Sequence, residues 1–147
     1  MPMNDEPDGA LNSMVAPSRN PSLRALIVED DPLVARSLAR WLRQRNVNVS
    51  VALRPSDVPA LGTGFDFGIF DIDLPETNGA ALAKLCLEKG IVGRAIFFSG
   101  SKDPSLRGMA AALGDFVEKG EGMAVLADRV LSAYRPNAVP RNLLAVG

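Results

Sequence analysis

Residues 67–73 have the sequence FGIFDID, in which a short apolar run ends directly in a carboxylate. An unbroken apolar run of this length is typical of a strand that is buried on both faces of a parallel sheet. A charged side chain at the end of such a strand is costly unless a cation or hydrogen-bond donors compensate it. Asp71 is therefore the first candidate for a functional residue.

Further strand-like runs lie on both sides of this one, and helix-like segments separate them. Residues 25–28 (ALIV) and 94–98 (RAIFF) are largely apolar, whereas residues 47–51 (VNVSV) alternate as an edge strand does. Phe116-Val117 adds a short fifth strand. The alternation predicts an α/β fold, a (βα)5 doubly wound parallel sheet of the flavodoxin-like kind, with strand order 2-1-3-4-5.

The segments between the strands carry helix signals. Asp31-Pro32 and Asp103-Pro104 each place a capping side chain before a proline at the first helical position. Pro59 makes the helix near residues 56–61 short or irregular. The remaining helices are expected over residues 79–89 and 123–134.

The ends of the chain differ in composition from its middle. We expect residues 1–21, which contain four prolines among polar residues, to be a disordered leader. Residues 22–134 form the predicted domain. Residues 135–147 are expected to be a flexible tail or linker, too short to form an output domain.

Composition excludes several classes of function. The net charge is −1, so the domain has no basic field with which to bind nucleic acid. Histidine is absent, which excludes His-based triads and His-ligated zinc. Cys86 is the one cysteine and cannot form an intrachain disulfide, as expected of a cytoplasmic protein. No apolar run approaches the roughly 20 residues of a membrane span, and no signal peptide is recognisable.

Polar side chains follow four of the five predicted strands at their carboxyl ends, where open parallel sheets hold their functional residues. These residues are Glu29, Asp30, Asp71, Ser99 and Lys119. Three carboxylates at neighbouring strand ends repel one another, and a bound Mg²⁺ would reverse that repulsion because it prefers oxygen ligands. The sequence therefore predicts a magnesium site at this edge.

Four motifs together carry a family resemblance. They are residues 26–32 (LIVEDDP), residues 70–75 (FDIDLP) with Asn78-Gly79 behind them, residues 98–100 (FSG) and residues 115–119 (DFVEK). In this order, over about residues 23–134, the sequence resembles the receiver domain of two-component response regulators.

The resemblance implies a role for each matching residue. Asp71 would accept a phosphoryl group from a sensor histidine kinase or a histidine phosphotransfer protein, and Ser99 and Lys119 would bind the phosphoryl oxygens. The Mg²⁺ ligands would be the carboxylates of Glu29, Asp30 and Asp71 and the backbone carbonyl of Asp73. Phe116 would act with Ser99 as a switch.

The resemblance also implies how such a domain acts. It would be no enzyme with a separate substrate, because it catalyses only its own phosphorylation and dephosphorylation. Its output would be contact with a downstream protein target, and activation can lead two copies to form a homodimer. Gly120 departs from the family, which usually has proline after the lysine, so we expect a more mobile loop there.

Two other interpretations stay open. One is a pseudo-receiver, an interaction module that is not phosphorylated, which Gly120 leaves open. The other is a Mg²⁺-dependent phosphatase of the haloacid-dehalogenase type, because residues 70–73 (FDID) resemble its Asp-x-Asp nucleophile signature. Those enzymes usually carry the signature near the N-terminus, whereas here it lies in the middle of the chain.

Overall fold

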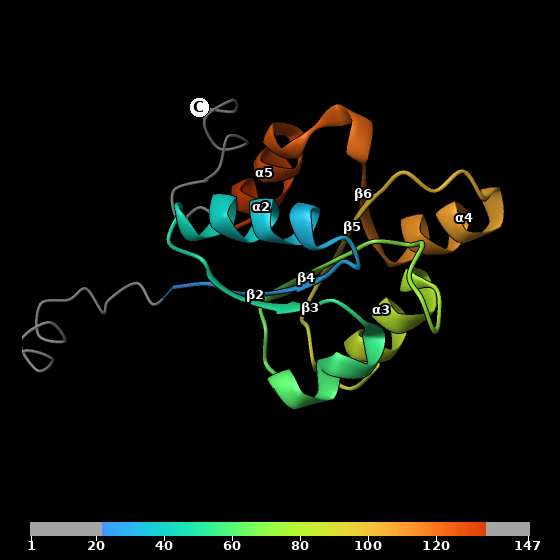
Figure 1. Ribbon diagram of the computed structural model, residues 1–147, viewed down its shortest axis with the longest axis horizontal. Helices are drawn as coiled ribbons and strands as arrows, with labels where there is room; N and C mark the ends of the chain where they lie inside the picture. Colours follow the sequence, from blue (N-terminus) through green and yellow to red (C-terminus); the bar gives the residue numbers. More distant parts are fainter. Residues whose placement is uncertain (1–21, 135–147) are drawn as a thin grey trace, which may run out of the picture.

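The computed structural model describes residues 22–134, which form a five-stranded parallel sheet with helices on both faces (Figure 1). The strands are β2 (Arg24–Val28), β3 (Asn48–Ala52), β4 (Phe67–Phe70), β5 (Ala95–Ser99) and β6 (Gly114–Glu118). Their order across the sheet is β3-β2-β4-β5-β6, which is 2-1-3-4-5 when they are counted along the chain. The predicted fold is therefore confirmed. The leader and tail expected at residues 1–21 and 135–147 lie outside the described residues.

Two layers of helices cover the sheet. The helices are α2 (Pro32–Arg43), α3 (Gly79–Glu88), α4 (Pro104–Leu113) and α5 (Met123–Ser132), with 3-10 helices η2 (Pro55–Leu61) and η3 (Lys119–Glu121). Figure 1 shows α2 and α5 on one side of the sheet and α3 on the other. Every helix between residues 22 and 134 falls short of the length and apolar character needed to cross a bilayer.

The helix starts follow the predicted signals. The Asp31 carboxylate accepts a hydrogen bond from the Leu33 N–H at 3.0 Å, and the Asp103 carboxylate accepts one from the Ser105 N–H at 2.9 Å. A proline occupies the first turn of both helices. These caps satisfy backbone donors that would otherwise have no partner, and so they fix where α2 and α4 leave the carboxyl ends of β2 and β5.

Successive residues of each strand point to opposite faces, and both faces are buried. Leu26 and Phe70 pack in the layer that includes α3 residues, whereas Ile27 and Ile69 pack in the layer that includes α2 and α5 residues. Because both layers exclude water, β2, β4 and β5 consist almost entirely of apolar residues. The site residues that follow these strands therefore stand on a rigid support.

Several predicted boundaries shift by one residue, and two differ by more. β6 has five residues rather than two, because Gly114 and Asp115 pair with Ala95 and Ile96 of β5 and Glu118 pairs with Ser99. Gly114 lies so close to β5 that a Cβ there would lie 2.0 Å from the Ala95 carbonyl oxygen. The last helix ends at Ser132 rather than Tyr134. The Tyr134 ring stacks on Phe67 with 5.5 Å between centroids, and its hydroxyl donates to the Asp66 carbonyl at 3.2 Å.

Gly79 presses the start of α3 against the backbone that follows β4. Its N–H donates to the Ile72 carbonyl at 2.8 Å. A Cβ at this position would lie 1.7 Å from the Asp71 carbonyl oxygen, far inside van der Waals contact. The absence of a side chain at Gly79 therefore allows α3 to support the segment that carries Asp71.

We predict that Gly79→Ala lowers the free energy of unfolding by about 2 kcal/mol or more, because the methyl group must push α3 away from this backbone. Gly108→Ala is the matched control, since Gly108 lies inside α4 with open space around its Cα. Alanine there should stabilise the protein by up to about 1 kcal/mol. Urea unfolding of both variants measures this, and similar effects of the two substitutions would contradict the proposed packing.

Candidate functional site

The predicted site residues converge at one edge of the sheet. Glu29 follows β2, Asp71 follows β4, Ser99 ends β5 and Lys119 follows β6. Parallel pairing sets these ends side by side, since Val28 pairs with Phe70 and Phe70 with Phe97. The predicted convergence is therefore present in the structure.

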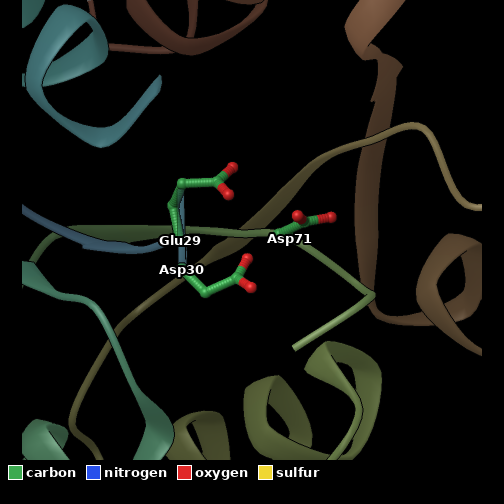
Figure 2. Close-up of side chains that lie close together, drawn as sticks. All are labelled: Glu29, Asp30 and Asp71. Atoms are coloured by element: carbon green, nitrogen blue, oxygen red, sulfur yellow. The ribbon is translucent and has the colours of Figure 1, made fainter. Parts of the chain in front are cut away.

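Three carboxylates form a cluster at this edge. Glu29, Asp30 and Asp71 each offer an oxygen, and these oxygens all lie within 4.8 Å of one another. Figure 2 shows Asp71 beside the pair formed by Glu29 and Asp30. Glu29 and Asp71 are buried, whereas Asp30 is exposed, so the cluster can be reached from solvent on one side. An all-oxygen set of this kind fits a hard divalent cation.

Lys119 supplies a positive charge to the cluster. Its Nζ lies 2.9 Å from Glu29 Oε1 and 3.0 Å from Asp71 Oδ2. Burial alone would lower the pKa of Lys119, but hydrogen bonds and attraction from Glu29 and Asp71 outweigh burial and raise that pKa above its usual value. The amine is therefore a firmly charged partner of both acids.

At Glu29, in contrast to Lys119, the effect of burial on the pKa outweighs that of the hydrogen bonds. Burial raises the pKa of Glu29, and repulsion from Asp71 adds to this rise. Hydrogen bonds from Lys119 and from the Asp31 N–H, at 3.1 Å, lower the pKa only in part. A cation placed among the three carboxylates would offset both the burial and the repulsion.

Ser99 lies on the other side of Asp71. Its hydroxyl donates to Asp71 Oδ1 at 2.6 Å and accepts from the Ile72 N–H at 3.3 Å and the Ser101 N–H at 3.1 Å. Ser99 is fully buried, so these bonds fix its hydroxyl toward the carboxylate. The two oxygens of Asp71 thus have different partners, a hydroxyl on Oδ1 and an amine on Oδ2.

Two predicted residues lie outside the carboxylate cluster. The Asp73 side chain is exposed, and its backbone N–H donates to Asp71 Oδ1 at 3.4 Å. Phe116 is half-buried on β6, where the Arg107 guanidinium carbon lies 4.5 Å from the centroid of its ring.

Sequence reasoning missed two residues beside the site. Ser101 is buried and holds the Ser99 hydroxyl through its N–H, and Arg107 pairs with Glu118, the residue before Lys119. The position of Ser101, two residues after Ser99, could have indicated its role. Nothing in the local sequence indicates a role for Arg107.

The arrangement suits an anionic group. A carboxylate oxygen can act as a nucleophile, and at Asp71 a hydroxyl and an ammonium lie on either side of the carboxylate. These are the donors that bind phosphoryl oxygens, and the neighbouring carboxylates can hold the cation that such a group requires.

Comparison with known proteins agrees with this chemistry. The response regulator receiver domain family matches residues 25–131. Curated relatives include the transcriptional regulatory proteins CutR of Streptomyces coelicolor and Streptomyces lividans. Each is 29% identical over 122 residues, which cover 80% of this chain and 56% of the relative. The chain thus spans little more than half the length of these relatives.

Solved structures show the same fold. The receiver domain of the Francisella response regulator 1452 has a TM-score of 0.67 at 20% identity, covering 80% of this chain and 99% of that one. The non-phosphorylated receiver domain of HemR from Leptospira biflexa has a TM-score of 0.65 at 27% identity, covering 78% of this chain and 98% of that one. Because the family matches most of the chain and the fold agrees, the chain belongs to the response regulator receiver domains of two-component signal transduction.

Proposed function

We propose that Asp71 accepts a phosphoryl group from the phosphohistidine of a sensor histidine kinase or a histidine phosphotransfer protein. A carboxylate oxygen of Asp71 forms a bond to phosphorus while the bond from phosphorus to the histidine nitrogen breaks. The imidazole keeps the electron pair and takes up a proton. The product is an acyl phosphate, and attack of water on phosphorus later returns the carboxylate and inorganic phosphate.

The observation that carries this proposal is the pair of contacts to Asp71. The Ser99 hydroxyl lies 2.6 Å from Oδ1, and the Lys119 amine lies 3.0 Å from Oδ2. Both groups stand where they can bind the oxygens of a phosphoryl group on this carboxylate. Phosphoryl transfer needs mainly positioning and neutralisation of charge, and these two side chains supply both.

We further propose that the domain binds Mg²⁺ through the carboxylates of Glu29, Asp30 and Asp71 and the backbone carbonyl of Asp73. Support comes from the all-oxygen cluster and from the preference of Mg²⁺ for such ligands. When bound, Mg²⁺ would offset the negative charge that the carboxylates and the phosphoryl group bring together.

Phosphorylation is proposed to change which proteins bind the domain, with Ser99 and Phe116 as the switch. Ser99 touches Asp71 directly, and half-buried Phe116 lies in the middle of β6, two residues before Glu118, which pairs with Ser99. The output would be contact with a downstream protein target, or pairing of two phosphorylated copies, in the cytoplasm. No separate substrate is turned over.

Both other interpretations can be distinguished from this proposal. A pseudo-receiver would have no need of a hydroxyl and an amine on the two oxygens of one buried carboxylate, so the contacts of Asp71 favour a phosphorylated domain. A phosphatase would turn over a phosphomonoester steadily. A receiver would instead hold one acid-labile phosphoryl group per chain.

We predict that the wild-type chain gains the mass of one phosphoryl group when incubated with acetyl phosphate and Mg²⁺. Asp71→Asn should gain none, because its amide is a poor nucleophile. Asp57→Asn is the control, since Asp57 forms an exposed ion pair with Arg54 at 3.6 Å and should leave the labelling unchanged. Intact mass spectrometry reads the result, and labelling of Asp71→Asn to the wild-type extent would contradict the proposal.

We also predict opposite effects of Asp30→Asn on stability without and with metal. In EDTA the variant should be at least as stable as the wild type, because one of three repelling charges is gone. Mg²⁺ at about 100 times its Kd should stabilise the wild type by about 2.7 kcal/mol and the variant far less. Urea unfolding in EDTA and in Mg²⁺ measures both quantities. An equal gain from Mg²⁺ in wild type and variant would argue against Asp30 as a ligand.

A further inference from the structure

Arg107, the fourth residue of α4, makes three contacts at the carboxyl end of the sheet, where the candidate site lies. Its Nη1 donates to the Ser101 carbonyl at 3.1 Å, and its Nη2 pairs with Glu118 Oε2 at 2.5 Å. Its guanidinium carbon lies 4.5 Å from the centroid of the Phe116 ring. One side chain therefore joins α4 to the segments after β5 and at the end of β6.

The first contact leads to Ser99. The carbonyl of Ser101 accepts from Arg107, and the N–H of Ser101 donates to Ser99 Oγ at 3.1 Å. Ser99 in turn donates to Asp71 Oδ1 at 2.6 Å. Both groups belong to one buried residue, so Ser101 links the Arg107 guanidinium to the Ser99 hydroxyl.

The second contact leads to Lys119. Glu118 ends β6 and directly precedes Lys119, and Gly120 and Gly122 follow. Gly122 has a φ of +90°, and glycines restrict a loop less than other residues do. Three bonds lie within this segment: the Glu121 side chain accepts from the Glu118 N–H at 3.2 Å, the Glu118 side chain accepts from the Glu121 N–H, and the Gly122 N–H donates to the Lys119 carbonyl at 3.1 Å. These bonds connect the segment only to itself, whereas the ion pair between Arg107 and Glu118 connects it to α4.

We propose that Arg107 is a positioning residue for the candidate site. Its ion pair with Glu118 holds the glycine-containing loop so that Lys119 reaches Asp71 and Glu29, while its bond to Ser101 orients Ser99. The planar fork of arginine suits several contacts at once, and lysine could not make them all. The proposal rests on the proposed phosphorylation of Asp71, but the placement of Lys119 can be measured without phosphorylation.

Arg94 provides a matched control. It pairs with Asp115 Oδ2 at 2.6 Å, with side chains 33% and 41% exposed, against 34% and 34% for Arg107 and Glu118. Arg94 precedes β5 and Asp115 lies near the start of β6, so this ion pair lies at the end of β6 opposite to Glu118. The guanidinium carbon of Arg94 also lies near an aromatic ring, 5.9 Å from the centroid of Tyr134. Loss of either ion pair removes similar interactions, but only the pair of Arg107 and Glu118 adjoins the site.

The test is the reactivity of Lys119 toward an acylating reagent in EDTA, measured by peptide mass mapping of the full chain. Lys119 is protected when its amine is held between Asp71 and Glu29. Lys84 in α3 and Lys89 at its end serve as internal references. In Arg107→Gln, acylation of Lys119 should rise roughly two- to five-fold over the references, the size expected when a partly exposed ion pair is lost. Arg94→Gln should leave this ratio unchanged.

Glu118→Gln should reproduce the effect, and it keeps the test decisive if Arg107→Gln folds poorly. Combined with Arg107→Gln, it should expose Lys119 no further than the stronger single substitution, because both act through one contact. Phosphorylation by acetyl phosphate and Mg²⁺ should slow by a similar factor in Arg107→Gln, and Arg107→Lys should restore part of the rate.

The outcomes separate the two proposals. Unchanged acylation of Lys119 in both Arg107→Gln and Glu118→Gln would overturn the positioning role, as would an equal rise in Arg94→Gln. If acylation changes as expected while the wild type takes up no phosphoryl group, the placement of Lys119 by Arg107 stands and the proposed phosphorylation fails.

Discussion

Repulsion among the three carboxylates at the carboxyl end of the sheet is the constraint on which the other features of the site depend. Glu29 and Asp71 are 3% and 5% exposed, so water screens them little. Lys119 contacts both, and backbone N–H groups of Asp31 and Asp73 donate to them. These contacts offset part of the repulsion, and they leave an all-oxygen set that a divalent cation can occupy.

The remainder of the fold holds the strand ends in place. Two apolar layers bury β2, β4 and β5 on both faces, and Gly79 lets α3 press against the backbone at Asp71. An arginine forms an ion pair with an acidic residue near each end of β6, Arg94 with Asp115 and Arg107 with Glu118. Apolar packing thus fixes the strand ends, and ion pairs help to fix the side chains that follow them. Together they place hydrogen-bond donors around the Asp71 carboxylate.

Much of this could be predicted from sequence because it follows from local patterns. The strand order could be predicted because residues 47–51 alternate as an edge strand does, whereas the other strands are continuous apolar runs. The carboxyl ends of parallel strands lie at one edge of the sheet, which predicted that the residues following them converge: Glu29, Asp71, Ser99 and Lys119. The contacts of Arg107 could not be predicted, since they depend on how α4 lies against β6. The length of β6 was missed because Gly114 and Asp115 have low strand propensity, which tertiary packing overrides.

The central claim is that Asp71 is the nucleophile, and it is tested most directly by locating the phosphoryl group. Borohydride reduces an acyl phosphate to an alcohol and releases phosphate, so a phosphorylated aspartate becomes homoserine. After incubation of the full chain with acetyl phosphate and Mg²⁺, reduction and peptide mass mapping should find homoserine in place of Asp71 and at no other aspartate. Reduction at Asp30 with Asp71 intact, or phosphate stably retained on Ser99, would contradict the claim.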